Sequence, residues 1–247
     1  MDPISVTAEP LTGTRILSQF WRGLVFVHWR VDPAEIASLF PPGIVPDVFD
    51  GSSWVGLIPF EMRDSAVLGG PAVPYFGTFT EVNVRLYGVD ADGHRGVVFC
   101  SLEASRLAAV LTARVLFGLP YIWAAASIST DAGAITYRSR RFAPGRASTL
   151  VSVRPSRTPV VGDPLADFLT ARWSLFVGRG GHTMAMPNEH DPWQLFEAEL
   201  LELEDDLVAA AGIRSLGGRA PDSVLYSPGV VTRFGRGRRV GTDVRPG

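Results

Sequence analysis

Apolar and polar residues alternate along several stretches of the chain, and a period of two is typical of β-strands. The alternation is clearest over residues 78–89. Its apolar positions include Val82, Val84 and Leu86. The positions between them are polar or amphipathic: Glu81, Asn83, Arg85 and Tyr87. One face of this strand is therefore expected to be polar along its length.

Six further segments alternate in the same way or are rich in β-branched and aromatic residues, which favour strands. These segments are residues 20–31, 53–63, 96–104, 121–129, 134–141 and 148–154. The turn signal over residues 90–93 predicts that the strands on its two sides pair as an antiparallel hairpin.

Helix signals are fewer. Asp32 and Pro33 predict a short helix that residues 41–43 end, and residues 106–117 show helical spacing of apolar side chains. A third helix is expected to begin at Asp163 and run to about Phe176.

Residues 178–191 contain glycine, histidine and proline and are expected to form a loop. The pattern over residues 193–211 allows two structures. It fits a helix over 197–211, and it also fits a long strand over 193–203 followed by a short helix over 205–211.

About eight strands without regular strand–helix alternation argue against a parallel doubly wound sheet. We expect a mainly β (α+β) fold, a closed or strongly curved antiparallel β-barrel with a few peripheral helices. Residues 1–19 are expected to form an N-terminal extension, 20–232 a single domain, and 233–247 a flexible Gly/Arg-rich tail.

A closed barrel turns one face of every strand inward, where polar side chains must satisfy one another or bind a ligand. A solvent-facing polar face is the alternative for residues 78–89. The charged candidates for such an interior are Arg22, His28, Glu81, Arg85 and Glu103. Carboxylates and guanidinium groups in a partly desolvated cavity suit acid–base chemistry on a carbonyl or carboxylate compound.

The composition of the chain argues against several classes of function. The 247 residues carry a formal net charge of −2, which does not favour binding to nucleic acid or to an anionic membrane. Lysine is absent, so Schiff-base catalysis through a lysine amine is excluded. The single cysteine, Cys100, excludes an intrachain disulfide.

The chain shows no long apolar run and no signal-like N-terminal segment, so a cytoplasmic protein without a membrane span is expected. The four histidines are scattered without a His-Glu-x-x-His or comparable spacing, although the group His182, Glu189, His190 and Asp191 could bind a cation weakly. Residues 178–181 follow a predicted helix rather than a strand, which is the wrong context for a dinucleotide fingerprint. Neither a metal site nor a dinucleotide cofactor is therefore predicted.

Four segments carry a family resemblance: residues 28–32, 54–60, 79–85 and 113–121. Over about residues 20–231 the chain resembles the YqjF-like family, which belongs to the acetoacetate decarboxylase-like superfamily. The resemblance implies a cone-like antiparallel β-barrel with the active site inside.

In the decarboxylase itself, a Gly-x-Pro-Lys-Lys segment supplies the Schiff-base lysine. The matching residues here are 118–122, which place Tyr121 at the position of that lysine. The resemblance also matches Arg22, ten residues before Asp32, to an active-site arginine and Glu81 to an active-site glutamate. A second glutamate of the decarboxylase has no counterpart near residues 54–57. The resemblance thus implies a retained cavity without the covalent chemistry.

On these grounds Tyr121 is expected to donate a hydrogen bond to a carbonyl or enolate oxygen, Glu81 to move a proton and Arg22 to hold a carboxylate. The expected activity is that of a cofactor-independent lyase, isomerase or cyclase on a small molecule. The substrate-binding candidates are His28, Trp54, Phe60, Asn83, Arg85, Glu103 and Arg114.

Two alternatives remain open. A non-catalytic protein would capture an organic acid or a hydrophobic small molecule, with Arg22 and Arg85 beneath a roof of Trp21, Trp54 and Phe60. A structural module would have a barrel filled by side chains, and Tyr121 would then be a buried aromatic with a satisfied hydroxyl. Either protein, or the enzyme, could form a homo-oligomer.

Overall fold

A computed structural model of the protein describes residues 4–71, 77–107, 110–111, 114, 118–143 and 145–241. Its strands are β1 (Leu17–Val31), β2 (Ile44–Pro46), β3 (Ser53–Val67), β4 (Phe79–Asp90), β5 (Arg95–Ala104), β6 (Tyr121–Asp131), β7 (Ala134–Arg141), β8 (Ser148–Pro159), β9 (Ser174–Arg179), β10 (His182–Glu189), β11 (Phe196–Asp205), β12 (Ser223–Phe234) and β13 (Arg238–Arg239). The helical segments are α1 (Pro33–Ile36), α3 (Pro164–Thr170), α4 (Leu207–Ala210) and the 3-10 turns η1 (Ala37–Leu39) and η2 (Arg214–Leu216). The mainly β fold is confirmed.

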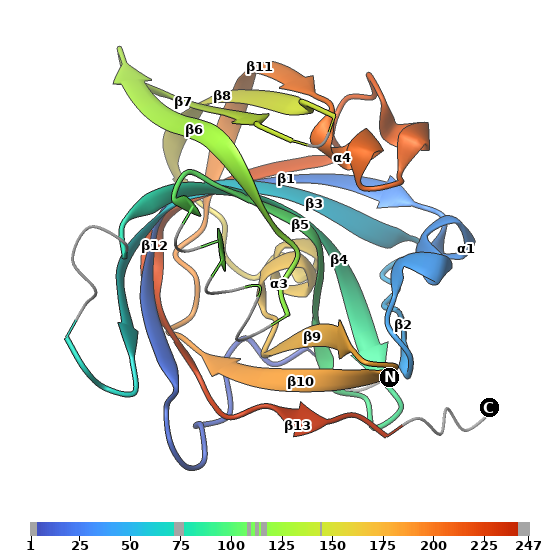
Figure 1. The fold of residues 1–247 in the computed structure, drawn as a ribbon. Helices are drawn as coiled ribbons and strands as arrows, with labels where there is room; N and C mark the ends of the chain where they lie inside the picture. Colours follow the sequence, from blue (N-terminus) through green and yellow to red (C-terminus); the bar gives the residue numbers. More distant parts are fainter. Residues whose placement is uncertain are drawn as a thin grey trace.

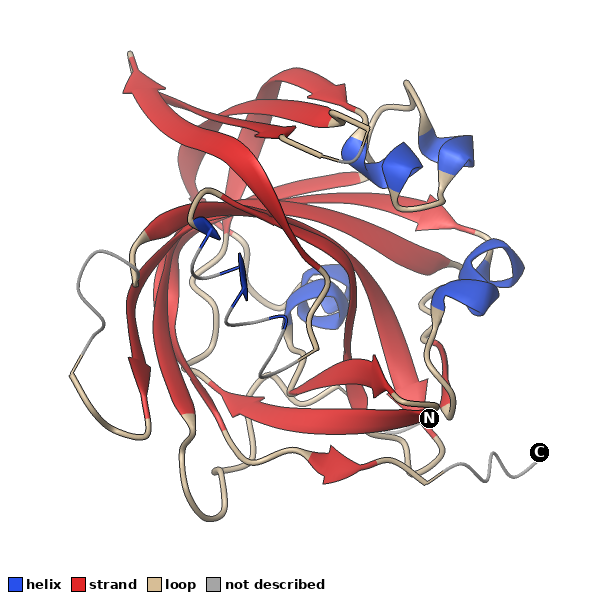
Figure 2. Cartoon of the chain, in the orientation of Figure 1, coloured by secondary structure: helices blue, strands red, loops and turns tan. Residues whose placement is uncertain are grey.

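Seven of these strands close into a ring, and Figure 1 looks along its axis. Strands β12, β1, β3, β4 and β5 pair antiparallel in that order. Strand β9 joins β5 in parallel, β10 pairs with β9, and β10 also pairs with β12. The expected closed barrel and the hairpin of β4 and β5 are therefore both present (Figure 2).

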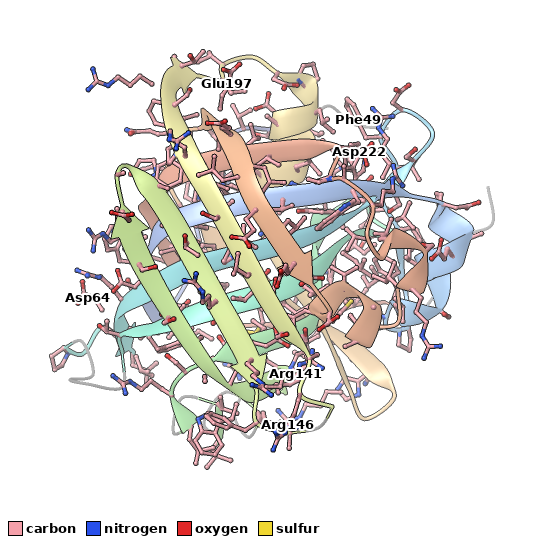
Figure 3. The ribbon with its side chains drawn as sticks, turned by 90° about the horizontal axis from the view of Figure 1, so that it is seen from above. Phe49, Asp64, Arg141, Arg146, Glu197 and Asp222 are labelled. Atoms are coloured by element: carbon pink, nitrogen blue, oxygen red, sulfur yellow. The ribbon has the colours of Figure 1, made fainter. Side chains whose placement is uncertain are left out.

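A second layer covers one side of the ring. Strands β6, β7, β8 and β11 lead from β5 to β12 and cross over β1 and β3 (Figures 1 and 3). Apolar side chains of the ring, such as Val27, Val55 and Val84, pack between the layers against Tyr137 and Val151. Strands β1, β3 and β4 consequently bury both faces, one between the layers and one inside the ring.

Helix α3 helps to fill the ring. Its N-cap is Asp163, whose carboxylate accepts a hydrogen bond from the backbone of Leu165 at 2.9 Å, and Pro164 occupies the first turn. Phe168 belongs to a buried cluster that also contains Tyr87 of β4. The helix ends at Thr170, so Arg172 follows it directly inside the molecule.

Two local predictions need correction, and a third is only partly covered by the described residues. The helix expected to reach Phe176 stops at Thr170, because residues from Ser174 onward form β9 and pair with β5 and β10. The loop expected over residues 178–191 is largely strand β10. Residues 106–117 are only partly described: 106–107, 110–111 and 114 lie within the structure, and the rest of this predicted helix lies outside the described residues.

The ambiguous segment 193–211 is a strand followed by a helix. Strand β11 alternates half-buried and exposed residues through Leu200, and a register shift between Leu200 and Glu202 interrupts that alternation. Tertiary pairing with β8 therefore decides against the helix that propensity alone favours. Part of the predicted flexible tail is also paired: Arg233 belongs to β12, and Arg238 pairs with Ala185 of β10. Within the part of the chain that the structure describes, every helix is too short or too polar to cross a bilayer.

Candidate functional site

The interior of the ring contains a cavity of about 70 Å³. Most of its lining is apolar: Leu17, Trp21, Met62, Val97, Phe99, Leu102, Leu119, Leu175, Met186, Trp193 and Phe234. Its polar lining consists of Gln19, Glu81, Arg85, Tyr121, Thr170, Arg172, Asn188 and His190. An apolar hollow with a few convergent polar groups is the usual form of a small-molecule site.

Glu81 and Tyr121 meet at this cavity. The Tyr121 hydroxyl donates a hydrogen bond to Glu81 Oε2 at 2.7 Å, and the residues are 2% and 6% exposed. Glu81 projects inward from β4, and Tyr121 is the first residue of β6, beside Leu102 of β5. The two side chains come from distant parts of the sequence but share one wall.

Local sequence explains how Tyr121 reaches the cavity. Gly118 adopts a φ of 69°, a left-handed conformation that glycine adopts without steric cost. The backbone N–H of Tyr121 then donates to the carbonyl of Leu119 at 2.8 Å, which tightens the turn before β6. Because side chains alternate along a strand, Tyr121 and Ile122 project to opposite faces.

Burial changes the proton affinity of both groups. It raises the pKa of Glu81 to about 7, an effect that hydrogen bonds from Tyr121 and Asn83 oppose and the charge of Glu103 reinforces. Burial, followed by the charge of Glu81, raises the pKa of Tyr121 well above its usual value of 10. At neutral pH the phenol is therefore a neutral donor, and the carboxyl group is partly protonated.

Two arginines line another part of the cavity. Arg85 donates from Nε to the Tyr87 hydroxyl at 2.9 Å and from Nη2 to the carbonyl of Leu169 at 3.3 Å. Arg172 donates from Nη1 to Asp47 at 2.5 Å and from Nε to the carbonyl of Phe168 at 2.7 Å. Both side chains are almost fully buried.

His28 is not a lining residue of the cavity, but it contacts the Tyr87 hydroxyl to which Arg85 donates. Its Nε2 lies 2.5 Å from the Tyr87 hydroxyl. The same hydroxyl accepts from Arg85, so Tyr87 joins His28 to Arg85. Burial and the charges of Arg85 and Arg172 lower the pKa of His28 well below 6.5, so the ring is neutral. Gly56 permits this contact, since a Cβ there would lie 2.9 Å from the Tyr87 hydroxyl.

Arg22 does not lie at the cavity, and the prediction of an interior position for it is wrong. A bulge at Gly23, which has a φ of 58°, reverses the alternation of β1. Before the bulge the odd residues face inward, as Trp21 does, and after it the even residues do. The side chain of Arg22 is 52% exposed and pairs with Glu61 at 3.2 Å.

Glu103 is also turned away from the cavity. Strand β5 has an extra residue, Cys100, between the partners of Val84 and Arg85. Beyond it Leu102 faces the cavity, and Glu103 lies on the opposite face, fully buried and paired with Arg141 at 2.6 Å. The predicted role of Glu103 in substrate binding has no geometric support.

The other predicted binding residues take different places. Asn83 is buried beside Glu81, and Phe60 packs on Trp21 at a ring separation of 5.8 Å. Trp54 is fully buried under Arg30, with its indole N–H unpartnered. Arg114 is exposed on the partly described helix. None of these four is among the cavity-lining residues that the structure describes.

Five polar lining residues escaped prediction: Gln19, Thr170, Arg172, Asn188 and His190. Arg172 follows α3, and His190 follows β10, in segments that were expected to be helix and loop. His190 donates from Nδ1 to the carbonyl of Asp191 at 2.7 Å and lies between the rings of Trp173 and Trp193. Strand alternation cannot indicate such positions, because it says nothing about which way side chains outside strands point.

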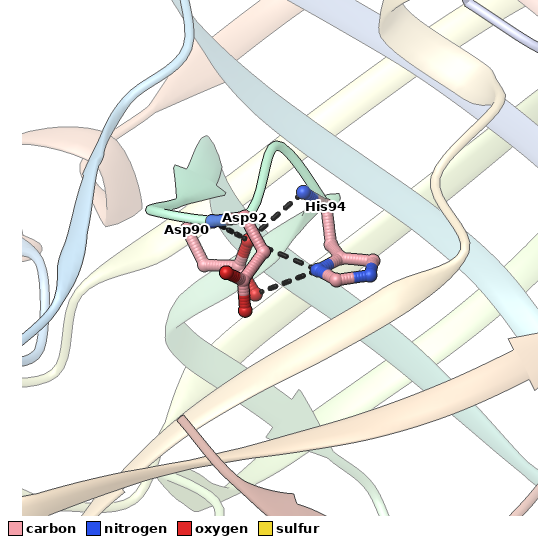
Figure 4. Close-up of side chains that lie close together, drawn as sticks. All are labelled: Asp90, Asp92 and His94. Carbon is pink, nitrogen blue, oxygen red and sulfur yellow. Dashed lines mark hydrogen bonds and ion pairs between the residues drawn. The ribbon is translucent and has the colours of Figure 1, made fainter. Parts of the chain in front are cut away.

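A group of possible metal ligands occurs at the turn between β4 and β5. Asp90, Asp92 and His94 lie close enough to share an ion (Figure 4). However, Oδ1 of Asp90 accepts the backbone N–H groups of Asp92 and His94 at 3.0 and 2.9 Å, and Arg238 lies 3.3 Å from Oδ2. Asp90 is thus engaged in holding the turn and the C-terminal strand.

The ring, the second layer and the interior site define an acetoacetate decarboxylase-like fold. The acetoacetate decarboxylase of Legionella pneumophila superimposes with a TM-score of 0.68 at 15% identity, over 95% of this chain and 92% of that one. The enduracididine biosynthesis enzyme MppR complexed with pyruvate gives 0.63 at 17% identity, over 95% and 94%. An acetoacetate decarboxylase-like enzyme from Sphingomonas wittichii gives 0.65 at 14% identity, over 95% and 99%.

Sequence similarity narrows this class to one family. The protein belongs to the DUF2071 family of uncharacterized conserved proteins, whose profile matches residues 18–231. It is 32% identical over 189 residues to YqjF of Bacillus subtilis strain 168, which covers 76% of this chain and 78% of that protein. The family resemblance is therefore confirmed.

Proposed function

We propose that the protein is a cofactor-independent enzyme that moves a proton at a carbon next to a carbonyl group. The observation that carries this proposal is the buried hydrogen bond of 2.7 Å between Tyr121 and Glu81 at the cavity. A phenol donor and a carboxyl group with a pKa of about 7 form a matched acid–base pair. Because the chain has no lysine, the proposed chemistry does not use a lysine Schiff base.

In the proposed reaction, ionised Glu81 removes a proton from the carbon beside the substrate carbonyl. The electron pair of that C–H bond moves toward the carbonyl oxygen and gives an enolate. Tyr121 turns its O–H from Glu81 to the enolate oxygen and stabilises the negative charge there. Glu81 then holds the transferred proton as a carboxylic acid.

The enolate leads to three classes of product without an oxidant or a reductant. Return of the proton to another carbon gives an isomer. Departure of a hydroxyl group from the next carbon, assisted by the proton on Glu81, gives dehydration. Attack of the enolate carbon on a second carbonyl group of the same substrate closes a ring, and the alkoxide oxygen that forms takes the proton from Glu81. The proposed activity is therefore of the isomerase, lyase or cyclase type.

A binding protein for an organic acid is the second candidate function. Its support is the same cavity, with apolar walls and two buried guanidinium groups. The two candidates differ in turnover, because only an enzyme accelerates a change in the bound molecule.

The test uses pyruvate in D₂O. Loss of the methyl proton signal in ¹H NMR measures enolisation, and saturation transfer to the same methyl group measures binding. We expect the protein to accelerate exchange over buffer. Glu81→Gln should lower the rate by about 10²–10⁴-fold and Tyr121→Phe by about 10²–10³-fold, with binding retained. Tyr226→Phe is the matched control, since that half-buried tyrosine packs against the core between the layers.

Bound pyruvate that exchanges at the rate of buffer would reject the enzyme and support the binding protein. Equal exchange in Glu81→Gln and the wild type would remove Glu81 as the base. If neither pyruvate nor acetoacetate binds at millimolar concentration, both candidate functions fail and the structural alternative gains.

A further inference from the structure

We propose that Arg85 and Arg172 together form a carboxylate-binding pole inside the cavity, and that its ligand is a small monocarboxylate. This deepens the proposed function by naming the class of its substrate, and it rests on that function only for the reaction that follows binding. Neither arginine has a role in the proposed acid–base step.

The charges around the pole do not balance. Asp47 is the shared partner of Arg172 at 2.5 Å and of Arg95 at 3.5 Å. Arg85 makes no ion pair with any carboxylate of the described residues; its partners are a phenol and a backbone carbonyl. The buried cluster therefore contains three guanidinium groups and one carboxylate.

An unbalanced buried cation is costly, and a guanidinium group cannot remove the cost by losing its proton at neutral pH. Glu81 does not supply the missing charge. Its carboxylate accepts a hydrogen bond from Tyr121, and among the described residues it makes no ion pair with either arginine of the pole. An anion from outside the chain is the remaining means of balance.

The two arginines line the same cavity. Both lie over the ring of Tyr87, with their central carbons 5.4 Å (Arg85) and 4.9 Å (Arg172) from its centroid. Nη2 of Arg172 is buried and has no hydrogen-bond partner in the described part of the chain. A ligand carboxylate in the cavity would neutralise Arg85, and its oxygen would reach that N–H group if the Arg172 side chain turned toward the cavity.

The shape of the site favours a carboxylate over a phosphate. A planar carboxylate matches the planar fork of a guanidinium group, and its single negative charge would pair with Arg85, the guanidinium group that has no carboxylate partner among the described residues. The cavity of about 70 Å³ is small, and its remaining walls are apolar, as at Phe99 and Leu102. A short organic acid fits these walls, with its carboxylate at the pole and its other end toward Glu81 and Tyr121.

The experiment compares propanoate with propanamide, an uncharged molecule of similar shape, using the full-length protein and isothermal titration calorimetry. Neither probe is an oxo acid, so the result does not depend on proton transfer. We expect propanoate to bind and propanamide not to bind. Arg85→Met should weaken propanoate binding at least tenfold. Arg154→Met, at a half-exposed arginine of β8 that pairs with Glu199, is the control and should bind normally.

Stability provides a second, independent readout. If Arg85 is kept for a ligand, Arg85→Met removes an unbalanced buried charge, and the melting temperature of the ligand-free protein should stay equal or rise. A purely structural arginine would lower it. Should Arg85→Met fail to fold, Arg85→Lys keeps the charge without the planar fork and should bind propanoate about tenfold more weakly.

Equal binding of propanoate and propanamide would overturn the proposal, as would tighter binding of inorganic phosphate. An Arg85→Met protein that melts earlier and still binds propanoate would also overturn it, as would an Arg85→Lys protein that binds propanoate as tightly as the wild type. Propanoate binding that depends on Arg85, together with no exchange of bound pyruvate, would retain the carboxylate pole and reject the proposed enzyme.

Discussion

The two buried faces of β1, β3 and β4 are built in opposite ways. The face between the layers consists of side chains such as Val27, Leu57 and Val84, which pack against β7 and β8. The face inside the ring carries Glu81 and Arg85 as well as apolar groups. The first face gains free energy from burial, whereas the second loses part of it to desolvated charges. Apolar packing and buried charged groups are thus separated across the thickness of one sheet.

The largest expected effect comes from the face between the layers. Leu57→Ala removes a fully buried side chain and should lower the free energy of unfolding by about 2–5 kcal/mol. Urea denaturation measures this change. Leu201→Ala, at a position 39% exposed on β11, is the control and should cost far less. Pyruvate binding by Leu57→Ala should be normal below its melting temperature; lost binding would show that the two faces are coupled.

For the inner face we expect a smaller effect on the free energy of unfolding, and this effect depends on pH. The pKa of Glu81 is raised from 4.5 to about 7 by burial, so its contribution to stability is fully present below pH 4.5 and is lost as the pH rises through 7. Glu81→Gln abolishes that loss. Between pH 5 and pH 8 the wild type should therefore lose about 2 kcal/mol relative to Glu81→Gln in urea denaturation. A constant difference across this range would mean that Glu81 titrates as an ordinary carboxyl group.

The two faces also show which side-chain directions can be predicted from the sequence. Alternation along β4 correctly placed Glu81 and Arg85 on one face, because β4 keeps its period of two from Glu81 to Tyr87. It failed where a bulge reverses the period, so Arg22 and Glu103 were assigned to the wrong face. An isolated glycine within a strand is a known signal of a bulge, and Gly23 offered that signal.

The remaining errors had no local signal. The bulge at Cys100 contains no glycine. It is visible only in the pairing of β5 with β4, which the sequence does not show. Arg172 and His190 reach the cavity from segments whose side-chain directions depend on tertiary contacts. Tyr121 was placed by its match to the decarboxylase segment, and the turn at Gly118 accounts for its position at the start of β6.

The smallest expected effect concerns Arg22, which the sequence analysis predicts to lie in the interior together with Arg85. Arg22 lies half-exposed on the outside of β1 and shares Glu61 with Arg63, whereas Arg85 is buried inside the ring. Exposed ion pairs contribute little, so Arg22→Met should change the free energy of unfolding by less than about 1 kcal/mol and leave the affinity for propanoate unchanged. Calorimetric titration beside Arg85→Met gives the comparison directly. A loss of affinity in Arg22→Met equal to that in Arg85→Met would contradict the assignment of the two side chains to opposite faces.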